Sequence, residues 1–126
     1  HIAVGPTGVF VIDAKCYKGR PRLRVEGGIL RPRTEKLMVG SRDCTKLVAG
    51  VQKQLDRVRS ALERAGLADV PVHGMLCFVE ADWPLIGGTF TISELYVLFP
   101  KKAVEHLVKP GPLDDAAIQR VHRTLA

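Results

Sequence analysis

An aspartate and a lysine, Asp13 and Lys15, follow directly on the apolar run Val9 to Ile12. Two residues apart in an extended strand, their side chains project from the same face. A carboxylate binds a hard divalent cation, which polarises a phosphate and lowers the pKa of a bound water. The neighbouring ammonium can position that water or offset charge that develops on the phosphorane. The pair suits phosphodiester hydrolysis, although a strand-end ion pair that only faces water has the same spacing.

A glutamine on a predicted helix, Gln54, is the second candidate. Residues 45–65 carry apolar residues at spacings of three and four, which predicts a helix that Asp43 or Thr45 can cap and Gly66 can end. At about 100° per residue, Gln54 lies roughly 60° from the centre of the apolar face. It could reach from there into a phosphate-binding cleft. A border glutamine with one hydrogen bond has the same pattern.

The positive charge is concentrated in the first third of the chain. Residues 1–46 hold ten Lys/Arg and four Asp/Glu, a net charge of +6, whereas residues 47–126 hold nine of each. Concentrated positive charge attracts a polyanion through counterion release, and a solubilising surface is the alternative. The residues that we expect to contact nucleic acid lie in the loop and strand after Lys15 and on the helix: Lys18, Arg20, Arg22, Arg24, Lys46, Lys53 and Arg57.

Strands on both sides of the helix must position these residues. Strands 2–4 and 9–12 flank a Gly-Pro-Thr-Gly turn, and strands 22–25 and 29–31 flank Glu26-Gly27-Gly28, so two hairpins are predicted. Apolar runs predict further strands at 72–79 and 94–99, and short helices at 101–108 and 114–125. This order predicts one α/β domain over residues 1–126, with a mixed sheet.

Composition excludes several other classes of protein. The chain has 126 residues, 46% of them apolar, which is enough for a core and too apolar for disorder. No apolar run approaches the roughly 20 residues that span a bilayer. Three cysteines without a CxxC pair argue against a disulfide framework and a zinc cage, so we expect a cytoplasmic protein. The chain opens at His1 in a strand-like pattern, and we expect it to be a trimmed fragment.

The run from Val4 to Gly19, VGPTGVFVIDAKCYKG, resembles the nuclease-related domain (NERD), a branch of the PD-(D/E)XK nuclease superfamily. Residues 54–62 and 76–83 are also similar to this family. The resemblance implies a restriction-endonuclease-like α/β fold, a mixed sheet flanked by helices, with a Mg²⁺- or Mn²⁺-dependent nuclease site in DNA processing. It implies that Asp13 is a metal ligand, Lys15 the catalytic lysine and Gln54 the helix residue that completes the site.

The family pattern also has a glutamate on a preceding helix and an aspartate just before the position of His1. Neither lies within residues 1–126, so we expect this chain to be without the family's N-terminal helix. The first hypothesis is metal-dependent cleavage of nucleic acid, with DNA favoured over RNA. The second is a catalytically inactive nucleic-acid-binding or regulatory module of the same fold. The third is a protein-interaction domain that docks a partner through helices 101–108 and 114–125.

Overall fold

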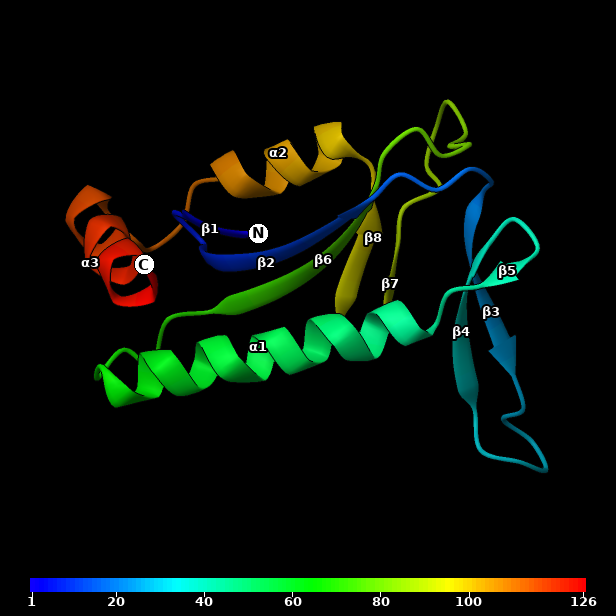
Figure 1. Ribbon diagram of the computed structural model, residues 1–126, viewed down its shortest axis with the longest axis horizontal. Coiled ribbons are helices and arrows are strands. Elements are labelled where there is room, and N and C mark those ends of the chain that lie inside the picture. The colour runs from blue at the N-terminus through cyan, green and yellow to red at the C-terminus, as the bar shows by residue number, and fades with distance from the viewer.

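The computed structural model describes all of residues 1–126 and contains a five-stranded mixed sheet (Figure 1). The strand order is β1-β2-β6-β8-β7, in which β2, β6 and β8 are parallel and the two edge strands are antiparallel to their neighbours. The strands are β1 (Ile2–Gly5), β2 (Gly8–Lys15), β6 (Val72–Phe78), β7 (Phe90–Ile92) and β8 (Leu95–Leu98). The predicted mixed α/β sheet is therefore confirmed.

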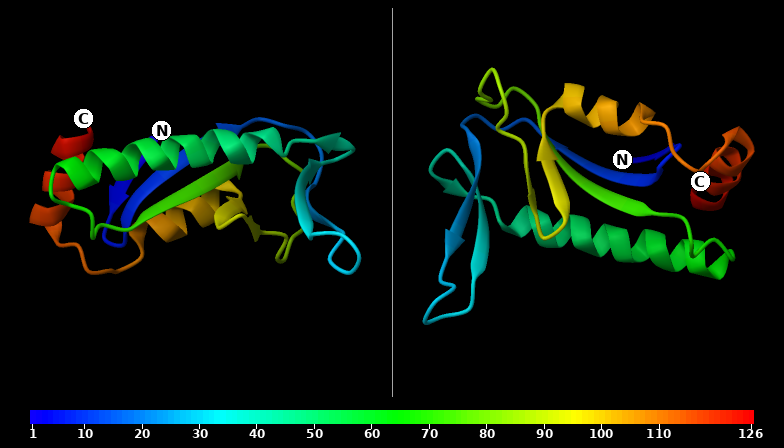
Figure 2. Two further views of the ribbon diagram at one scale, coloured as in Figure 1. Left: turned by 90° about the horizontal axis from the view of Figure 1, so that it is seen from below. Right: turned by 180° about the vertical axis from the view of Figure 1, so that it is seen from behind.

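Helices cover both faces of this sheet (Figures 1 and 2). Helix α1 (Lys46–Arg64) packs on one face, and α2 (Pro100–Val108) packs on the other. Helix α3 (Asp115–Leu125) lies against α1 and β1, at the end of the sheet where β2 begins. The predicted helices 45–65, 101–108 and 114–125 are confirmed to within one residue at each end.

Both ends of α1 are set by local chemistry. Thr45 is the N-cap residue, but its hydroxyl does not cap the helix, because it donates to Asp43 and accepts from the backbone N–H of Leu37. At the other end the N–H of Gly66 donates to Glu63 and that of Leu67 to Leu62, a Schellman arrangement in which Gly66 has a φ of 72°. The predicted end of the helix at Gly66 is confirmed.

Alternate residues of β2 belong to different cores. Val9 and Val11 are buried under α1, together with the apolar stripe of that helix. Phe10 is buried on the opposite face, beneath α2. A methyl group in place of the hydrogen on Gly74 would lie 2.5 Å from Leu95 and 3.0 Å from Leu55, so a glycine lets α1 approach the sheet closely. This alternation determines which face Asp13 and Lys15 share.

A second, smaller sheet projects from the end of the molecule where β2 finishes (Figure 1). It consists of β3 (Pro21–Glu26), β4 (Thr34–Val39) and the short β5 (Arg42–Asp43), all antiparallel. We refer to residues 21–39 as the arm. Leu37 and Val39 at the base of the arm are buried in the core beneath α1, while the tip extends past the N-terminal end of α1.

The predicted strand at 29–31 is wrong. The partner of β3 is β4, with Leu23 opposite Leu37, and residues 29–31 lie in the connection between these strands. Leu37 and Val39 supply the apolar side chains that bury the base of the arm, whereas Ile29 and Leu30 are 96% and 97% exposed. Burial of Leu37 and Val39, and not of Ile29 and Leu30, therefore sets the register of the hairpin.

All three cysteines are free thiols, of which Cys44 and Cys77 are buried and Cys16 is exposed. None of the helices combines the length and the apolar character that crossing a bilayer requires.

Candidate metal and nucleic-acid site

Asp13 and Lys15 lie side by side on the face of β2 that α1 covers. Strand β2 extends to Lys15, so both residues belong to the strand and follow Val9 and Val11 on the same face. The Lys15 Nζ atom is 3.3 Å from the Asp13 Oδ1 atom. Their side chains are 34% and 24% exposed, respectively, so the pair lies at the rim of the core and is open to solvent. The predicted proximity of the carboxylate and the ammonium is confirmed.

The Asp13 carboxylate has free coordination sites. Lys15 is its one ionic partner, and no backbone or side-chain N–H or O–H donates a hydrogen bond to it. A half-buried carboxylate with unused oxygen lone pairs is a suitable ligand for a hard cation, and Mg²⁺ in proteins is often held by only one or two carboxylates. No group of three or more His, Cys, Asp and Glu side chains within the chain could hold a metal ion.

Pairing of β1 with β2 identifies the position beside Asp13. The N–H of Ile12 donates to the carbonyl of His1, and the terminal amino group of His1 donates to the carbonyl of Ile12. Strands β1 and β2 are antiparallel, and Ile2 lies opposite Val11. A residue one position earlier in β1 therefore lies opposite a residue one position later in β2. One more residue of β1 would lie opposite Asp13, with its side chain on the same face of the sheet. This is the position at which the family pattern has an aspartate.

Gln54 lies on the flank of α1 that faces β2. On the other flank, Gln52 and Arg59 line a groove of about 410 Å³ with Ser93 and Tyr96, which belong to the β8 side of the sheet. Gln54 is about 160° around the helix from Gln52, so it faces the β1–β2 side. Its side chain is exposed and forms no hydrogen bond with Asp13 or Lys15. Helical side chains lean toward the N-terminus, which directs Gln54 toward the carboxyl end of β2.

The basic residues of α1 lie on its outer surface, further from the sheet than Gln54. Lys46, Lys53 and Arg57 are exposed, and they lie within about 40° of one another around the helix. The opposite flank carries Asp56 and Glu63 beside Arg59. The basic residues therefore form a stripe on the outer surface of α1, nearer to Gln54 than to Gln52.

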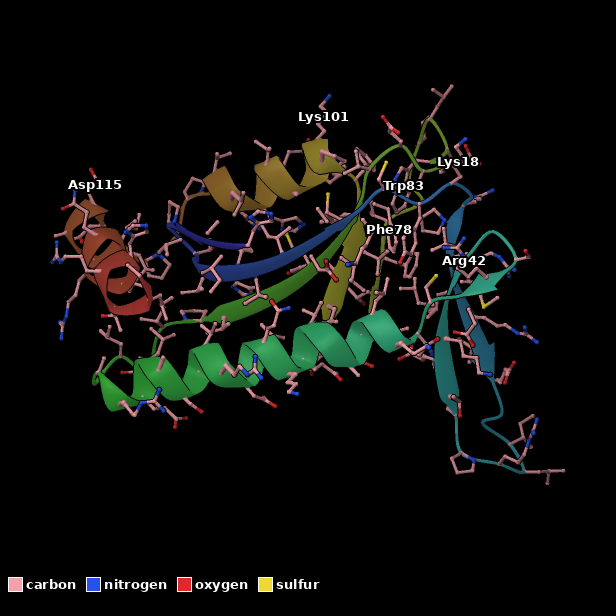
Figure 3. The ribbon with its side chains drawn as sticks, in the orientation of Figure 1. Lys18, Arg42, Phe78, Trp83, Lys101 and Asp115 are labelled. Atoms are coloured by element: carbon pink, nitrogen blue, oxygen red, sulfur yellow. The ribbon has the colours of Figure 1, made fainter.

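The other predicted nucleic-acid contacts lie beyond β2. Lys18 and Arg20 are exposed in the connection from β2 to β3, and Figure 3 shows Lys18 at the same end of the molecule as Arg42. Arg22 and Arg24 are exposed on one face of β3, where Arg22 donates to the carbonyl of Gly40. Arg24 pairs with Glu26, so part of its charge is neutralised.

Two contacts of the β2–β3 connection were not expected from the sequence. The Cys16 thiol donates to Glu80 over 3.2 Å, and this hydrogen bond raises the pKa of the thiol, which disfavours the reactive thiolate. The guanidinium of Arg42 lies 5.0 Å from the centre of the Tyr17 ring, a cation–π contact. The partners are 64 and 25 residues apart, and no local pattern in the sequence relates residues at such separations.

The mixed sheet with a helix packed beside an Asp-x-Lys strand end is the architecture expected of a nuclease-type α/β protein. Residues 1–79 match the profile of the nuclease-related domain, NERD, and the chain therefore belongs to this family. Family membership implies a nuclease-related function. Comparison with curated proteins and with solved structures gave no significant match.

Proposed function

We propose that residues 1–126 form a nuclease-type domain that cleaves DNA in a reaction that depends on Mg²⁺ or Mn²⁺. The observation that carries this proposal is the Asp13–Lys15 pair, 3.3 Å apart on an open rim of the sheet, in a chain of the nuclease-related family. Asp13 is proposed as a metal ligand, Lys15 as the catalytic lysine and Gln54 as the polar residue that completes the site.

The chemistry requires a cation and an activated water at one phosphate. When bound, the metal ion acts as a Lewis acid on the phosphate. Asp13 would hold the ion through the carboxylate oxygens that Lys15 leaves free. The ammonium of Lys15 would stabilise charge that develops on the phosphate oxygens. Gln54 would orient a water by donating or accepting a hydrogen bond, since its amide can do both.

DNA binding is supported by the positions of the basic residues. Lys46, Lys53 and Arg57 form a stripe on the outer surface of α1, nearer to Gln54 than to Gln52, and Lys18 and Arg20 follow β2 directly. These two groups of cations would contact phosphates on either side of the Asp13–Lys15 pair. Phosphate contacts of this kind fix the position of a nucleic acid without reading its sequence.

The test is a cleavage assay of the full-length protein on single- and double-stranded DNA and on RNA, with Mg²⁺ or Mn²⁺ and with EDTA. The proposal expects cleavage that requires the metal and that Asp13→Ala and Lys15→Ala each reduce at least about 100-fold. Asp56→Ala is the matched control, because this exposed carboxylate lies on the other flank of α1. Metal-dependent cleavage that both substitutions leave intact would show that the site lies elsewhere.

A catalytically inactive nucleic-acid-binding or regulatory module is the second candidate function. It is favoured by one observation, namely that no group of three or more His, Cys, Asp and Glu side chains in residues 1–126 could hold a metal ion. This candidate expects salt-dependent DNA binding by the full-length protein without turnover, and binding that Asp13→Ala does not change. Turnover under any of the metal conditions above excludes it.

A further inference from the structure

The arm ends in two adjacent apolar side chains that are almost completely exposed. Ile29 and Leu30 are 96% and 97% exposed. They occupy the apex of a turn in which the N–H of Gly28 donates to the carbonyl of Arg31 over 2.7 Å. Removing apolar side chains from water lowers the free energy. Burial of this exposed pair against a partner would therefore stabilise the complex.

The charge of the arm indicates what kind of partner this is. Residues 21–39 contain five basic and two acidic residues, a net charge of +3, which is half of the net charge of +6 of the whole chain. Arg31, next to the apex, has no carboxylate partner, and Arg33 pairs with Glu35 over 3.6 Å while remaining 63% exposed. Such exposed ion pairs are weak, so a phosphate can replace the carboxylate. The tip is therefore apolar at its apex and cationic beside it, which suits a polyanion.

The base of the arm is anchored, so its direction is defined. Leu37 and Val39 are buried, and Leu23 opposite Leu37 packs against the same core. From this base the two strands extend past the N-terminal end of α1, on the side of the sheet that α1 covers (Figures 1 and 2). Asp13 and Lys15 point to this same side. The arm therefore extends on the side of the sheet that carries the Asp13–Lys15 pair.

Duplex DNA fits this combination of shape and charge. Two-stranded β-ribbons bind DNA in the major or the minor groove. Leucine and isoleucine side chains can insert between base pairs from the minor groove and bend the duplex, while arginines contact the neighbouring phosphates. An anionic membrane could also accept an apolar, basic tip. The position of the arm beside the Asp13–Lys15 pair favours the nucleic acid.

We infer that the arm holds duplex DNA, with Ile29 and Leu30 inserted in the minor groove and Arg31 and Arg33 on the flanking phosphates. This inference rests on the proposed function, because the ligand is the nucleic acid on which the Asp13 site acts. It adds two statements to that function. The preferred ligand is double-stranded, and it is bent when bound.

The test uses the full-length protein with Asp13→Asn, so that the DNA stays intact. Ile29→Ser/Leu30→Ser removes the apolar apex, and Leu85→Ser/Ile86→Ser is the matched control. Leu85 and Ile86 are a second adjacent pair, 105% and 92% exposed, in the loop between β6 and β7 on the other side of the sheet. Fluorescence anisotropy gives the affinity for a short duplex, and energy transfer between dyes at its two ends gives the bend.

The expected result is that the apex variant binds duplex about tenfold more weakly and no longer bends it, while the control stays within about twofold of the parent. Binding and bending unchanged in the apex variant would overturn the inference. The same variants are mixed with phosphatidylserine vesicles. Vesicle binding that only the apex variant loses, together with unchanged DNA binding, would identify a membrane contact and would also overturn it.

The two proposals fail in different ways. If DNA bending depends on Ile29 and Leu30 but the wild-type protein never cleaves DNA, the proposed nuclease activity is wrong. The inference that the arm binds and bends duplex DNA is then retained. If the apex variant cleaves DNA at the wild-type rate and neither protein bends it, the proposed nuclease activity is retained. The inference about the arm is then wrong.

Discussion

The Nζ atom of Lys15 lies 3.3 Å from the Oδ1 atom of Asp13, and one strand carries both residues on the same face. Substitutions of the two residues should have different effects, because Asp13 is proposed to bind the metal and Lys15 to act in the chemical step. Asp13→Asn should abolish Mn²⁺ binding and cleavage, whereas Lys15→Met should retain Mn²⁺ binding and lower kcat about 100- to 1,000-fold. Calorimetric titration with Mn²⁺ and single-turnover kinetics measure these effects. Equal loss of metal affinity in the two variants would contradict the assignment of roles.

The two exposed glutamines of α1 offer a matched pair for the helix position. Gln54 lies on the β2 flank and Gln52 in the groove near β8. Gln54→Ala should lower kcat about tenfold, with little change in KM, because a water-orienting amide acts on the chemical step. Gln52→Ala should leave both parameters unchanged. Similar effects of the two substitutions would indicate a general effect on α1 rather than a specific role of Gln54.

The charged flanks of α1 should differ in their contribution to DNA binding. Lys53→Ala and Arg57→Ala each remove a cation from the basic stripe on the outer surface of α1, and each should lower the slope of log K against log salt by about 0.9. Arg59→Ala removes a cation from the other flank, beside Asp56, and should leave the slope unchanged. Binding isotherms at several salt concentrations measure the slopes. A decrease of equal size for Arg59→Ala would show that only total charge matters.

Substitutions of two glycines should change stability in opposite directions. Gly74→Ala places a methyl group 2.5 Å from Leu95 and 3.0 Å from Val51 in the core beneath α1, and should lower the free energy of unfolding by about 1–3 kcal/mol. Gly50→Ala places its methyl group in open space within α1 and should raise it by about 0.5–1 kcal/mol. Urea denaturation tests both. Equal stability of the two variants would show that α1 does not pack closely on Gly74.

His106 should make stability depend on pH. Burial, followed by the charge of nearby Lys109, lowers the pKa of its imidazole below the ordinary value of 6.5, and His73, Lys102 and Glu105 have smaller effects. The unfolded chain takes up the proton at the higher pH, so this contribution to stability is present above pH 6.5 and is lost as the pH falls through the pKa of the folded state.

Replacement of His106 by glutamine should therefore flatten the dependence of unfolding free energy on pH between about 7.5 and 5. His122→Gln, at an exposed position on α3, is the matched control for replacing a histidine by glutamine. Urea denaturation at each pH gives the free energies. If the stability of His106→Gln falls more steeply with decreasing pH than that of the wild type, the direction of the pKa shift assigned to His106 is wrong.

Features that depend on neighbouring residues could be predicted from the sequence. The apolar spacing and Gly66 define α1, because both act within a few residues along the chain. The alternation along β2 likewise places Asp13 and Lys15 together, since it needs only the geometry of one strand.

Features that depend on distant residues could not be predicted. The arm pairs residues 21–26 with 34–39 because Leu37 and Val39 find a core formed by other elements, and periodicity gives no information about that core. Likewise, the β2 flank of α1 is known only once the order of the strands is known, so the sequence could not show which side of the sheet Gln54 faces.

The pairing of His1 with Ile12 has a practical consequence for biochemical work on this chain. A purification tag joined directly to His1 would continue β1 and place its last residue opposite Asp13. A polyhistidine tag there would bring extra imidazoles to the candidate metal site, and metal titrations would then report on the tag as well. A tag after Ala126 avoids this, since the C-terminus follows α3, at the end of the sheet where β2 begins.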